Sequence, residues 1–247
     1  MDSFNCGCDS SRRVPHHAHP RQEPTVSRPT VGPAPARRRR AGRPSAGVLD
    51  RRIIARAALD VVSARGYSGL TMSAVATSLG VSPSALYNHV SSKQELLQWI
   101  QELVMDGVDH SLFATHPLDE ALVRWARTYR DVFADHAPLI PLIAVMPVSS
   151  SRRLLEMYEA VTGGFVRAGW PREAVVPAIV ALESFVFGSA LDATAPDDIF
   201  DPGEHAGTLP QFEDALAAQR ATGEHNADAA FATGLRAMVA GLLASRP

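Results

Sequence analysis

The stretch "VSPSALYNHVSSKQELL", from Val81 to Leu97, places a tyrosine, an asparagine, a histidine and a lysine among small serines and alanines. Ser82 followed by Pro83 is typical of a helix N-cap and first helical residue, because a proline needs no N–H there. Leu86 and Val90 are spaced i and i+4, so they face the interior together. The polar side chains of this short helix must therefore face something else.

Two helices are predicted before this stretch. One runs from about residue 49 to Gly66 with Asp50 as its N-cap, and a short second helix begins at Thr71 and ends at Gly80. Two short helices joined by a glycine-containing turn, the second too polar to be buried, are typical of a helix-turn-helix that enters the major groove of DNA.

The rest of the chain is also predicted to be helical. Ser92 and Glu95 form a capping box, in which each side chain accepts the N–H of the other residue, and they open a helix that runs to about His110. Apolar periodicity predicts further helices over residues 118–135, 138–146, 151–169, 171–193 and 227–243, with an irregular loop before the last. The fold class is therefore all-α.

Charge is distributed unevenly along the chain. Residues 1–48 hold nine arginines and three acids, a net charge of +6, whereas the remainder holds 15 basic and 23 acidic residues, a net charge of −8. Residues 1–46 are rich in Pro, Ser, His and Arg without apolar periodicity, which predicts a disordered basic arm. A basic arm on an acidic body indicates a polyanionic partner at one end.

Composition also bounds the compartment and the cofactors. Cys6 and Cys8 are the only cysteines, so no disulfide framework is expected and the cytoplasm is the natural location. Their spacing fits no common zinc site, and we expect no metal or other cofactor. We expect no membrane span either, because the hydrophobic stretch Pro138–Val148 is shorter than the roughly 20 residues that a bilayer requires.

The region from Leu49 to about Val104 resembles the TetR family of bacterial transcriptional repressors, through "GYSGLT", "AVATSLGVS", "LYNHV" and "KQELL". The resemblance implies an all-helical homodimer, in which three N-terminal helices bind DNA and a larger C-terminal domain binds a small molecule. It divides the chain into the arm (1–46), a helix-turn-helix domain (47–95) and a ligand-binding and dimerisation domain (96–247).

The same resemblance implies which side chains meet DNA. Four residues match positions that contact the DNA backbone: Thr71, Tyr87, His89 and Lys93. Five match positions where operator-reading side chains lie: Ser82, Pro83, Ser84, Ala85 and Asn88. Lys93 is the only lysine in the chain and opens a helix, where the macrodipole disfavours a cation unless a phosphate is bound beside it. The alternatives are a solvated Lys93, a packing role for Tyr87 and a structural role for His89.

The arginine run "RRRRAGRPS", Arg37 to Ser45, lies directly before the first helix. Flexible arginines of this kind reach into narrow minor grooves, and we assign Arg39, Arg40 and Arg43 to such contacts. The alternative is a nonspecific solvated charge run.

The final third resembles the tetracycline-repressor branch of the family, whose last two long helices form the dimer bundle. Small residues recur there at i, i+4, i+7 and i+11, a spacing that lets helices pack closely. The predicted interface residues are Phe185, Gly188, Ala230, Gly234, Ala237, Met238 and Gly241. The alternative is a purely intrachain contact.

Apolar and aromatic residues of the middle helices are predicted to line a ligand pocket. They are Trp125, Tyr129, Phe133, Leu142, Met146, Tyr158, Phe165 and Phe187. Each one alone is also a plausible core residue. The metal-binding histidine of the tetracycline-repressor branch has no clear counterpart, His136 being the nearest, so the inducer is left open.

The sequence therefore predicts a repressor that a small-molecule inducer releases from a palindromic operator. Two alternatives stay open: an architectural DNA-binding protein without a ligand switch, and an enzyme that uses the acidic loop 196–207. The enzyme is disfavoured, because no nucleophile–base pair stands at a recognisable spacing.

Removal of residues 1–46 tests the arm. Fewer phosphate contacts release fewer counterions, so we expect lower DNA affinity and a flatter dependence of affinity on salt, with the preferred operator unchanged. Fluorescence anisotropy across a salt series measures this. A truncated protein that keeps the full salt slope would mean that the arm has no role in DNA binding.

Overall fold

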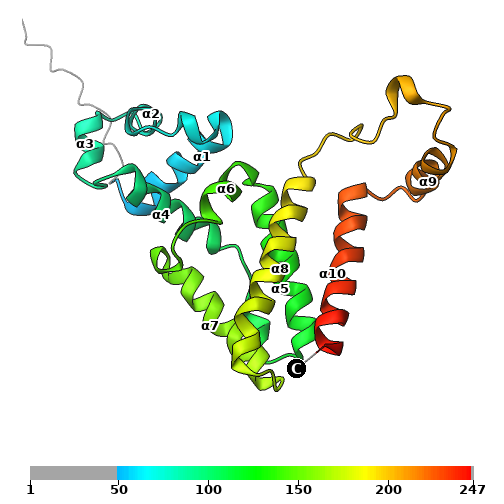
Figure 1. Cartoon of the computed structure of the whole chain (residues 1–247). Coiled ribbons are helices and arrows are strands. Elements are labelled where there is room, and N and C mark those ends of the chain that lie inside the picture. The colour runs from blue at the N-terminus through cyan, green and yellow to red at the C-terminus, as the bar shows by residue number, and fades with distance from the viewer. Residues whose placement is uncertain (1–48, 246–247) are drawn as a thin grey trace, which may run out of the picture. The chain divides into compact units, whose positions relative to one another are not determined.

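The computed structural model describes residues 49–245, and every regular element in that range is a helix, which confirms the predicted all-α class (Figure 1). The basic arm, with Arg39, Arg40 and Arg43, lies outside the described residues. The α-helices are α1 (Arg51–Gly69), α2 (Met72–Ser78), α3 (Pro83–Tyr87), α4 (Lys93–Met105), α5 (Leu118–Ala134), α6 (Ile140–Ile143), α7 (Arg152–Arg167), α8 (Arg172–Asp192), α9 (Pro210–Ala221) and α10 (Asn226–Ala244). Short 3₁₀ turns lie at Ser111–Ala114, Ala137–Leu139, Val148–Ser150 and Gly203–His205.

The first two helices begin at the predicted caps. The side-chain oxygens of Asp50 and Thr71 each accept the N–H of the residue three positions later, at 2.8 and 3.0 Å. The predicted stop at Gly66 is a kink instead: Gly66 has a φ of 67°, which glycine adopts without strain, and the helix continues to Gly69.

Helix α3 has only five residues, and its apolar side holds it in place. Ser82 is its N-cap, accepting the N–H of Ala85 at 3.2 Å, and Pro83 is its first residue, as predicted. Leu86 and Val90 are 0% and 1% exposed. The inward direction predicted for these two side chains is confirmed.

The start of α4 differs from the prediction in one partner. The Ser92 hydroxyl accepts the N–H of Glu95 at 3.1 Å. The Glu95 carboxylate, however, accepts the N–H and the hydroxyl of Ser91, at 2.8 and 2.6 Å, and not the N–H of Ser92. The backbone at Ser92 is extended (φ −155°, ψ 162°), and in this geometry the Glu95 side chain reaches Ser91. These hydrogen bonds lower the pKa of Glu95.

Helix α4 ends at Met105, five residues before the predicted end near His110. A turn at Gly107 follows, and a Cβ on this glycine would lie 2.8 Å from a methyl carbon of Val132 on α5. The helix therefore ends just before a turn that lies close against α5.

The C-terminal helices are built around α5, which contacts α7, α8 and α10. Trp125, Tyr129 and Phe133, one turn apart on α5, are 0–1% exposed. Their rings follow one another with centroids 5.5 and 5.2 Å apart. This aromatic row forms the centre of the second half of the molecule.

Two predicted elements need correction. The helix expected over residues 138–146 is only α6, Ile140–Ile143, between 3₁₀ turns, because prolines at 138, 141 and 147 limit the backbone hydrogen bonds. The predicted irregular loop before the last helix contains α9. That helix starts with Pro210 and consists mostly of good helix formers. It buries no residue, so its sequence lacks the apolar periodicity by which the other helices were predicted.

Helices α8 and α10 are long and apolar enough, by length and composition, to cross a bilayer. In the structure they pack on α5 and on each other. Yet only 39% and 22% of their most hydrophobic windows are buried. Much of the apolar surface of both helices is therefore left uncovered within a single chain.

Candidate functional site

The predicted DNA-reading helix presents its polar side to solvent. Tyr87 is 54% exposed, and Ser84, Asn88 and His89 are exposed beside it. Ser82 and Pro83 are exposed at the helix start, and Ala85 is half-buried. Because only Leu86 of α3 is buried, nearly the whole helix surface is available to a partner. The packing role considered for Tyr87 does not describe a side chain that is more than half exposed.

Thr71 lies at the start of α2, and its side chain is exposed. Its hydroxyl oxygen accepts the N–H of Ala74, which leaves the hydroxyl hydrogen free to donate to a phosphate. A backbone contact by Thr71 is thus compatible with its capping role.

Lys93 has a structural role that sequence reasoning missed. Its ammonium donates to the backbone carbonyl of Tyr67 at 3.3 Å and lies 3.7 Å from the centre of the Tyr67 ring. This contact fastens the start of α4 to the end of α1. An ammonium has three N–H donors, so two remain for a phosphate, and the predicted DNA contact stays a prediction.

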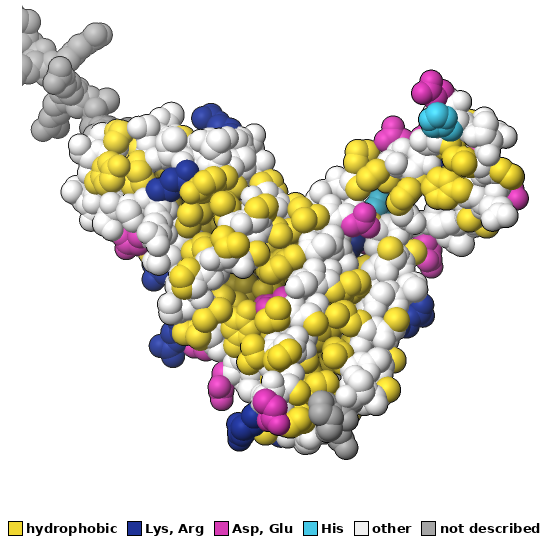
Figure 2. Space-filling view, viewed as in Figure 1, with side chains coloured by type: hydrophobic (Ala, Val, Ile, Leu, Met, Phe, Trp, Pro, Cys, Tyr) yellow, Lys and Arg dark blue, Asp and Glu magenta, His cyan; other side chains and the backbone are white. Residues whose placement is uncertain are grey.

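The predicted pocket residues divide into two groups. Trp125, Tyr129, Phe133 and Phe165 are fully buried and pack against neighbouring rings, as core residues do. Leu142, Met146, Tyr158 and Phe187 are only partly buried. Figure 2 shows hydrophobic side chains gathered in a hollow over α6, α7 and α8, with acidic atoms visible among them.

Glu183 is the functional candidate that sequence reasoning missed. It is 7% exposed, and its carboxylate accepts the hydroxyl of Tyr129 at 3.1 Å and that of Tyr158 at 2.8 and 3.0 Å. Burial raises the pKa of Glu183, although both hydrogen bonds oppose the shift. The available signal was its isolation, since it is the only ionisable side chain of α8 between Glu173 and Asp192.

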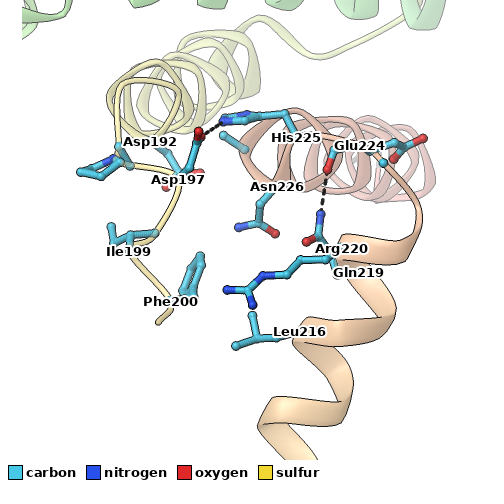
Figure 3. Close-up of a pocket in the computed structure, with 14 residues that line it drawn as sticks. Asp192, Asp197, Ile199, Phe200, Leu216, Gln219, Arg220, Glu224, His225 and Asn226 are labelled. Atoms are coloured by element: carbon cyan, nitrogen blue, oxygen red, sulfur yellow. Dashed lines mark hydrogen bonds and ion pairs between the residues drawn. The ribbon is translucent and has the colours of Figure 1, made fainter. Parts of the chain in front are cut away.

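The acidic loop 196–207, which was considered for an enzyme, lines a surface cavity. A cavity of about 400 Å³ lies between the end of α8, α9 and the start of α10, and Arg220 points toward it (Figure 3). His225 Nε2 lies 3.4 Å from the Asp197 carboxylate, which is 93% exposed. Within residues 49–245 no three His, Cys, Asp or Glu side chains are placed to hold a metal.

His136, the nearest sequence candidate for a metal-binding histidine, lies elsewhere. It lines a cavity with Arg52 and Arg56 of α1 and Leu103 of α4. Burial lowers its pKa. The same cavity is lined by the end of α4 and by Val132 and Asp135 at the end of α5, whereas the rings of the aromatic row and Glu183 do not line it.

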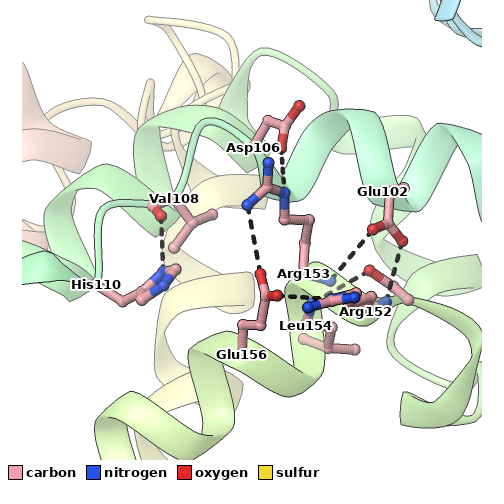
Figure 4. Close-up of polar contacts among 9 residues, drawn as sticks. Glu102, Asp106, Val108, His110, Arg152, Arg153, Leu154 and Glu156 are labelled. Carbon is pink, nitrogen blue, oxygen red and sulfur yellow. Dashed lines mark hydrogen bonds and ion pairs between the residues drawn. The ribbon is translucent and has the colours of Figure 1, made fainter.

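Helices α4 and α7 are joined by polar contacts (Figure 4). The Glu102 carboxylate accepts the backbone N–H groups of Arg152 and Arg153, at 3.1 and 3.3 Å, at the start of α7. The Arg153 guanidinium pairs with Asp106 at 2.8 Å. A carboxylate there satisfies free N–H groups and complements the positive end of the helix dipole. We call these contacts of Glu102 and Asp106 with Arg152 and Arg153 the α4–α7 junction.

The predicted dimer residues are partly used within the chain. A Cβ on Gly234 would lie 2.7 Å from the Phe185 ring, and Phe185 stacks on Phe231 with centroids 5.6 Å apart. Gly234 and Phe185 therefore make a contact within one chain, which is the alternative to a dimer contact. Gly188 and Gly241 have nothing within 4 Å of a built Cβ.

Helices α8 and α10 leave apolar residues exposed on the sides that face away from the core. Ala230, Ala237 and Gly241 are exposed and Met238 is partly buried on α10. On α8, Val176, Val180 and Leu191 are 63%, 52% and 45% exposed. We call these exposed residues, together with Gly188, the α8–α10 face.

Comparison with known proteins shows the family. Residues 54–100 match the bacterial regulatory proteins of the tetR family, and residues 115–246 match the tetracyclin repressor-like C-terminal domain. The chain is 30% identical over 203 residues to tetracycline repressor protein class A from transposon 1721 of Escherichia coli, a match that covers 78% of this chain and 90% of that protein.

Solved structures agree with this assignment. A possible TetR family transcriptional regulator from Streptomyces coelicolor A3(2) superposes with a TM-score of 0.66 at 26% identity, covering 80% of this chain and 100% of that one. BioQ with its double-stranded DNA operator gives a TM-score of 0.51 at 25% identity, covering 69% and 99%. The chain has a helix-turn-helix whose second helix is exposed, and both of its halves match the family. It therefore belongs to the TetR family and is a DNA-binding transcriptional regulator.

Proposed function

We propose that this regulator is a cytoplasmic, homodimeric repressor that leaves a palindromic operator when a small molecule binds its C-terminal helices. The observation that carries the proposal is the exposed polar side of α3, held out by the fully buried Leu86. A single short helix reads one half-site, so two copies related by a two-fold axis read a palindrome.

Within each copy, the division of labour follows exposure. Ser84 and Asn88, together with Ser82, Pro83 and Ala85, face base edges, where short polar side chains make hydrogen bonds that differ from base to base. Tyr87, His89, Thr71 and Lys93 flank them and donate to phosphates, which fixes the register without reading sequence. The arginines of the arm add attraction to the DNA backbone.

The α8–α10 face is the proposed dimer interface. It combines exposed valines and a leucine with alanines and glycines, and the exposed Glu173 lies at its border, one turn before Val176. An apolar face of this kind is costly in water and packs closely on its own symmetry mate. Such an interface also accounts for two helices that are more apolar than their burial within one chain requires.

The proposed ligand site is the hollow over α6, α7 and α8 (Figure 2). Tyr158 on α7 and Phe187 on α8 are only partly buried, and each contacts a buried group: Tyr158 donates to Glu183, and Phe187 meets the rings of Tyr129 and Phe133. The tetracycline repressor's name states the ligand class of that relative. His136 lines a cavity that neither the aromatic rings nor Glu183 line, which gives no support for the same ligand here.

Helix α4 links the two functions. It contacts α1 of the DNA-binding helices and α7 of the ligand-binding helices, so the proposed division at residues 95 and 96 falls inside a helix that both parts share. A ligand that displaces α7 displaces α4 through the α4–α7 junction and alters the spacing of the two α3 helices. To reverse the DNA-bound population, it must favour the released state by several kcal/mol.

The contrast between Asn88→Ala and Tyr87→Ala or Lys93→Ala tests the recognition helix. We expect Y87A and K93A to weaken binding to all duplexes alike. We expect N88A to reduce the free energy of binding by about 1–3 kcal/mol through the loss of discrimination at one base pair only. Selection from a random duplex pool, followed by anisotropy titration, measures both effects. K93R and S63A are the matched controls. Equal, uniform losses from all three variants would remove Asn88 from the base-reading set.

Charge placed on the α8–α10 face tests the dimer. Each of the single variants V180E and A237E would bury two carboxylates at the two-fold interface, one from each copy. We therefore expect either variant to be monomeric at micromolar concentration in analytical ultracentrifugation. A64E, an exposed alanine on α1, is the control and should leave the dimer intact. Variants on the face that sediment like the parent protein would exclude it as the interface.

Glu102→Gln tests the coupling. The loss of the negative charge weakens the cap on α7, so we expect faster hydrogen exchange at the amides of Arg152 and Arg153. Binding of a selected duplex should slow this exchange in the parent protein and have a smaller effect in E102Q. E159Q, which changes an exposed carboxylate on α7, is the control. If DNA leaves α7 unaffected in the parent protein, the proposed route through α4 is wrong.

A further inference from the structure

The buried carboxylate of Glu183 has no positive partner among residues 49–245. Its recorded hydrogen bonds come from the hydroxyls of Tyr129 and Tyr158, and no ion pair reaches it. Arg130, the cation next to Tyr129 in the sequence, pairs with other carboxylates: with Asp228 at 2.6 Å and with Asp131 at 3.2 Å.

An unpaired buried carboxylate is costly to keep. Its removal from water disfavours the charged form, and hydrogen bonds from two neutral phenols offset only part of that cost. A glutamine of the same size would accept the same phenol hydrogen bonds without the charge. The chain nevertheless places a glutamate there, as the only ionisable side chain in the middle of its most apolar helix.

The surroundings of Glu183 suit a cation with an apolar body. Tyr129, Phe133 and Phe187 meet with ring centroids 5.1–5.5 Å apart, and Phe187 lies one turn beyond Glu183 on α8. The faces of aromatic rings attract cations, and the attraction is strongest where water is excluded. An anionic ligand would meet the carboxylate and the same ring faces unfavourably.

We propose that the inducer is a hydrophobic molecule with a basic amine or quaternary cation, and that Glu183 binds this positive group while Tyr129 and Tyr158 orient the carboxylate. This inference rests on the proposed function, since it names the ligand class of the same hollow. The ligand supplies the positive charge that the folded chain leaves out, so ligand binding turns a desolvated charge into an ion pair.

Direct binding to the full-length protein tests the proposal. The probes are three aromatic cations of different shape, tetraphenylphosphonium, ethidium and 9-aminoacridine, and tetraphenylborate as an anion with the shape of the first. Titration calorimetry gives the affinities of the parent protein, E183Q and the control E159Q, which removes an exposed carboxylate next to Tyr158. Thermal unfolding without ligand verifies that the variants fold.

We expect at least one cation to bind the parent protein and E159Q, with tetraphenylborate bound at least tenfold more weakly than tetraphenylphosphonium where that cation binds. In E183Q the affinity for the cation should fall by about tenfold or more, because a charge-assisted contact becomes a neutral one. If E183Q does not fold, Tyr158→Phe replaces it. This variant keeps the charge but loses its orientation, and it should bind the cation several-fold more weakly than the parent protein.

Two outcomes would overturn the inference: no cation of the set binds the parent protein, or E183Q binds the cations as the parent protein does. A separate titration with a selected duplex distinguishes this failure from failure of the proposed function. Cations that need Glu183 for binding but leave DNA affinity unchanged would support the site and contradict the ligand switch. A duplex that the protein does not select contradicts the regulator itself.

Discussion

The burial of Leu86 is the interaction on which the rest of the structure depends. A five-residue helix is far too short to be stable alone in water, so α3 exists only because its apolar side is packed against the neighbouring helices. With Leu86 and Val90 turned inward, the polar residues of α3 have no direction left but outward. The exposed polar surface that we propose reads DNA thus follows from one buried leucine in an otherwise polar turn.

Helix α4, which follows α3 in the chain, connects the DNA-binding helices to the remainder of the structure. Helix α4 is fastened to α1 through Lys93 and Tyr67 and to α7 through Glu102. Polar contacts between helices have preferred distances and directions, so these contacts restrict where α4 can lie relative to α1 and α7. A ligand that acts on α7 therefore has a physical route to the DNA-binding helices.

The sequence allowed the local contacts to be predicted and left the distant ones hidden. Asp50, Thr71, Ser82 and Ser92 each cap a residue three positions away, so their roles were visible in the spacing alone. The partners of Lys93, Glu102 and Glu183 lie 26, 50 and 54 residues away along the chain. No periodicity encodes such pairs, because they depend on how whole helices pack. Helix α9 was missed for another reason, since it buries nothing within one chain.

The distance between the two α3 helices of a DNA-bound dimer tests the central claim most directly. Spin labels at Ser63→Cys, an exposed position on α1 outside the proposed DNA contacts, with Cys6 and Cys8 replaced by serine, allow pulsed electron-spin resonance on a duplex selected from a random pool. The position of Ser63 relative to α3 in each copy converts the label separation into the distance between the two α3 helices. The account predicts one narrow distribution near about 35 Å, the separation of successive major grooves on one side of B-DNA. The absence of any distance between two labels, or a separation that no two adjacent grooves can match, would contradict it.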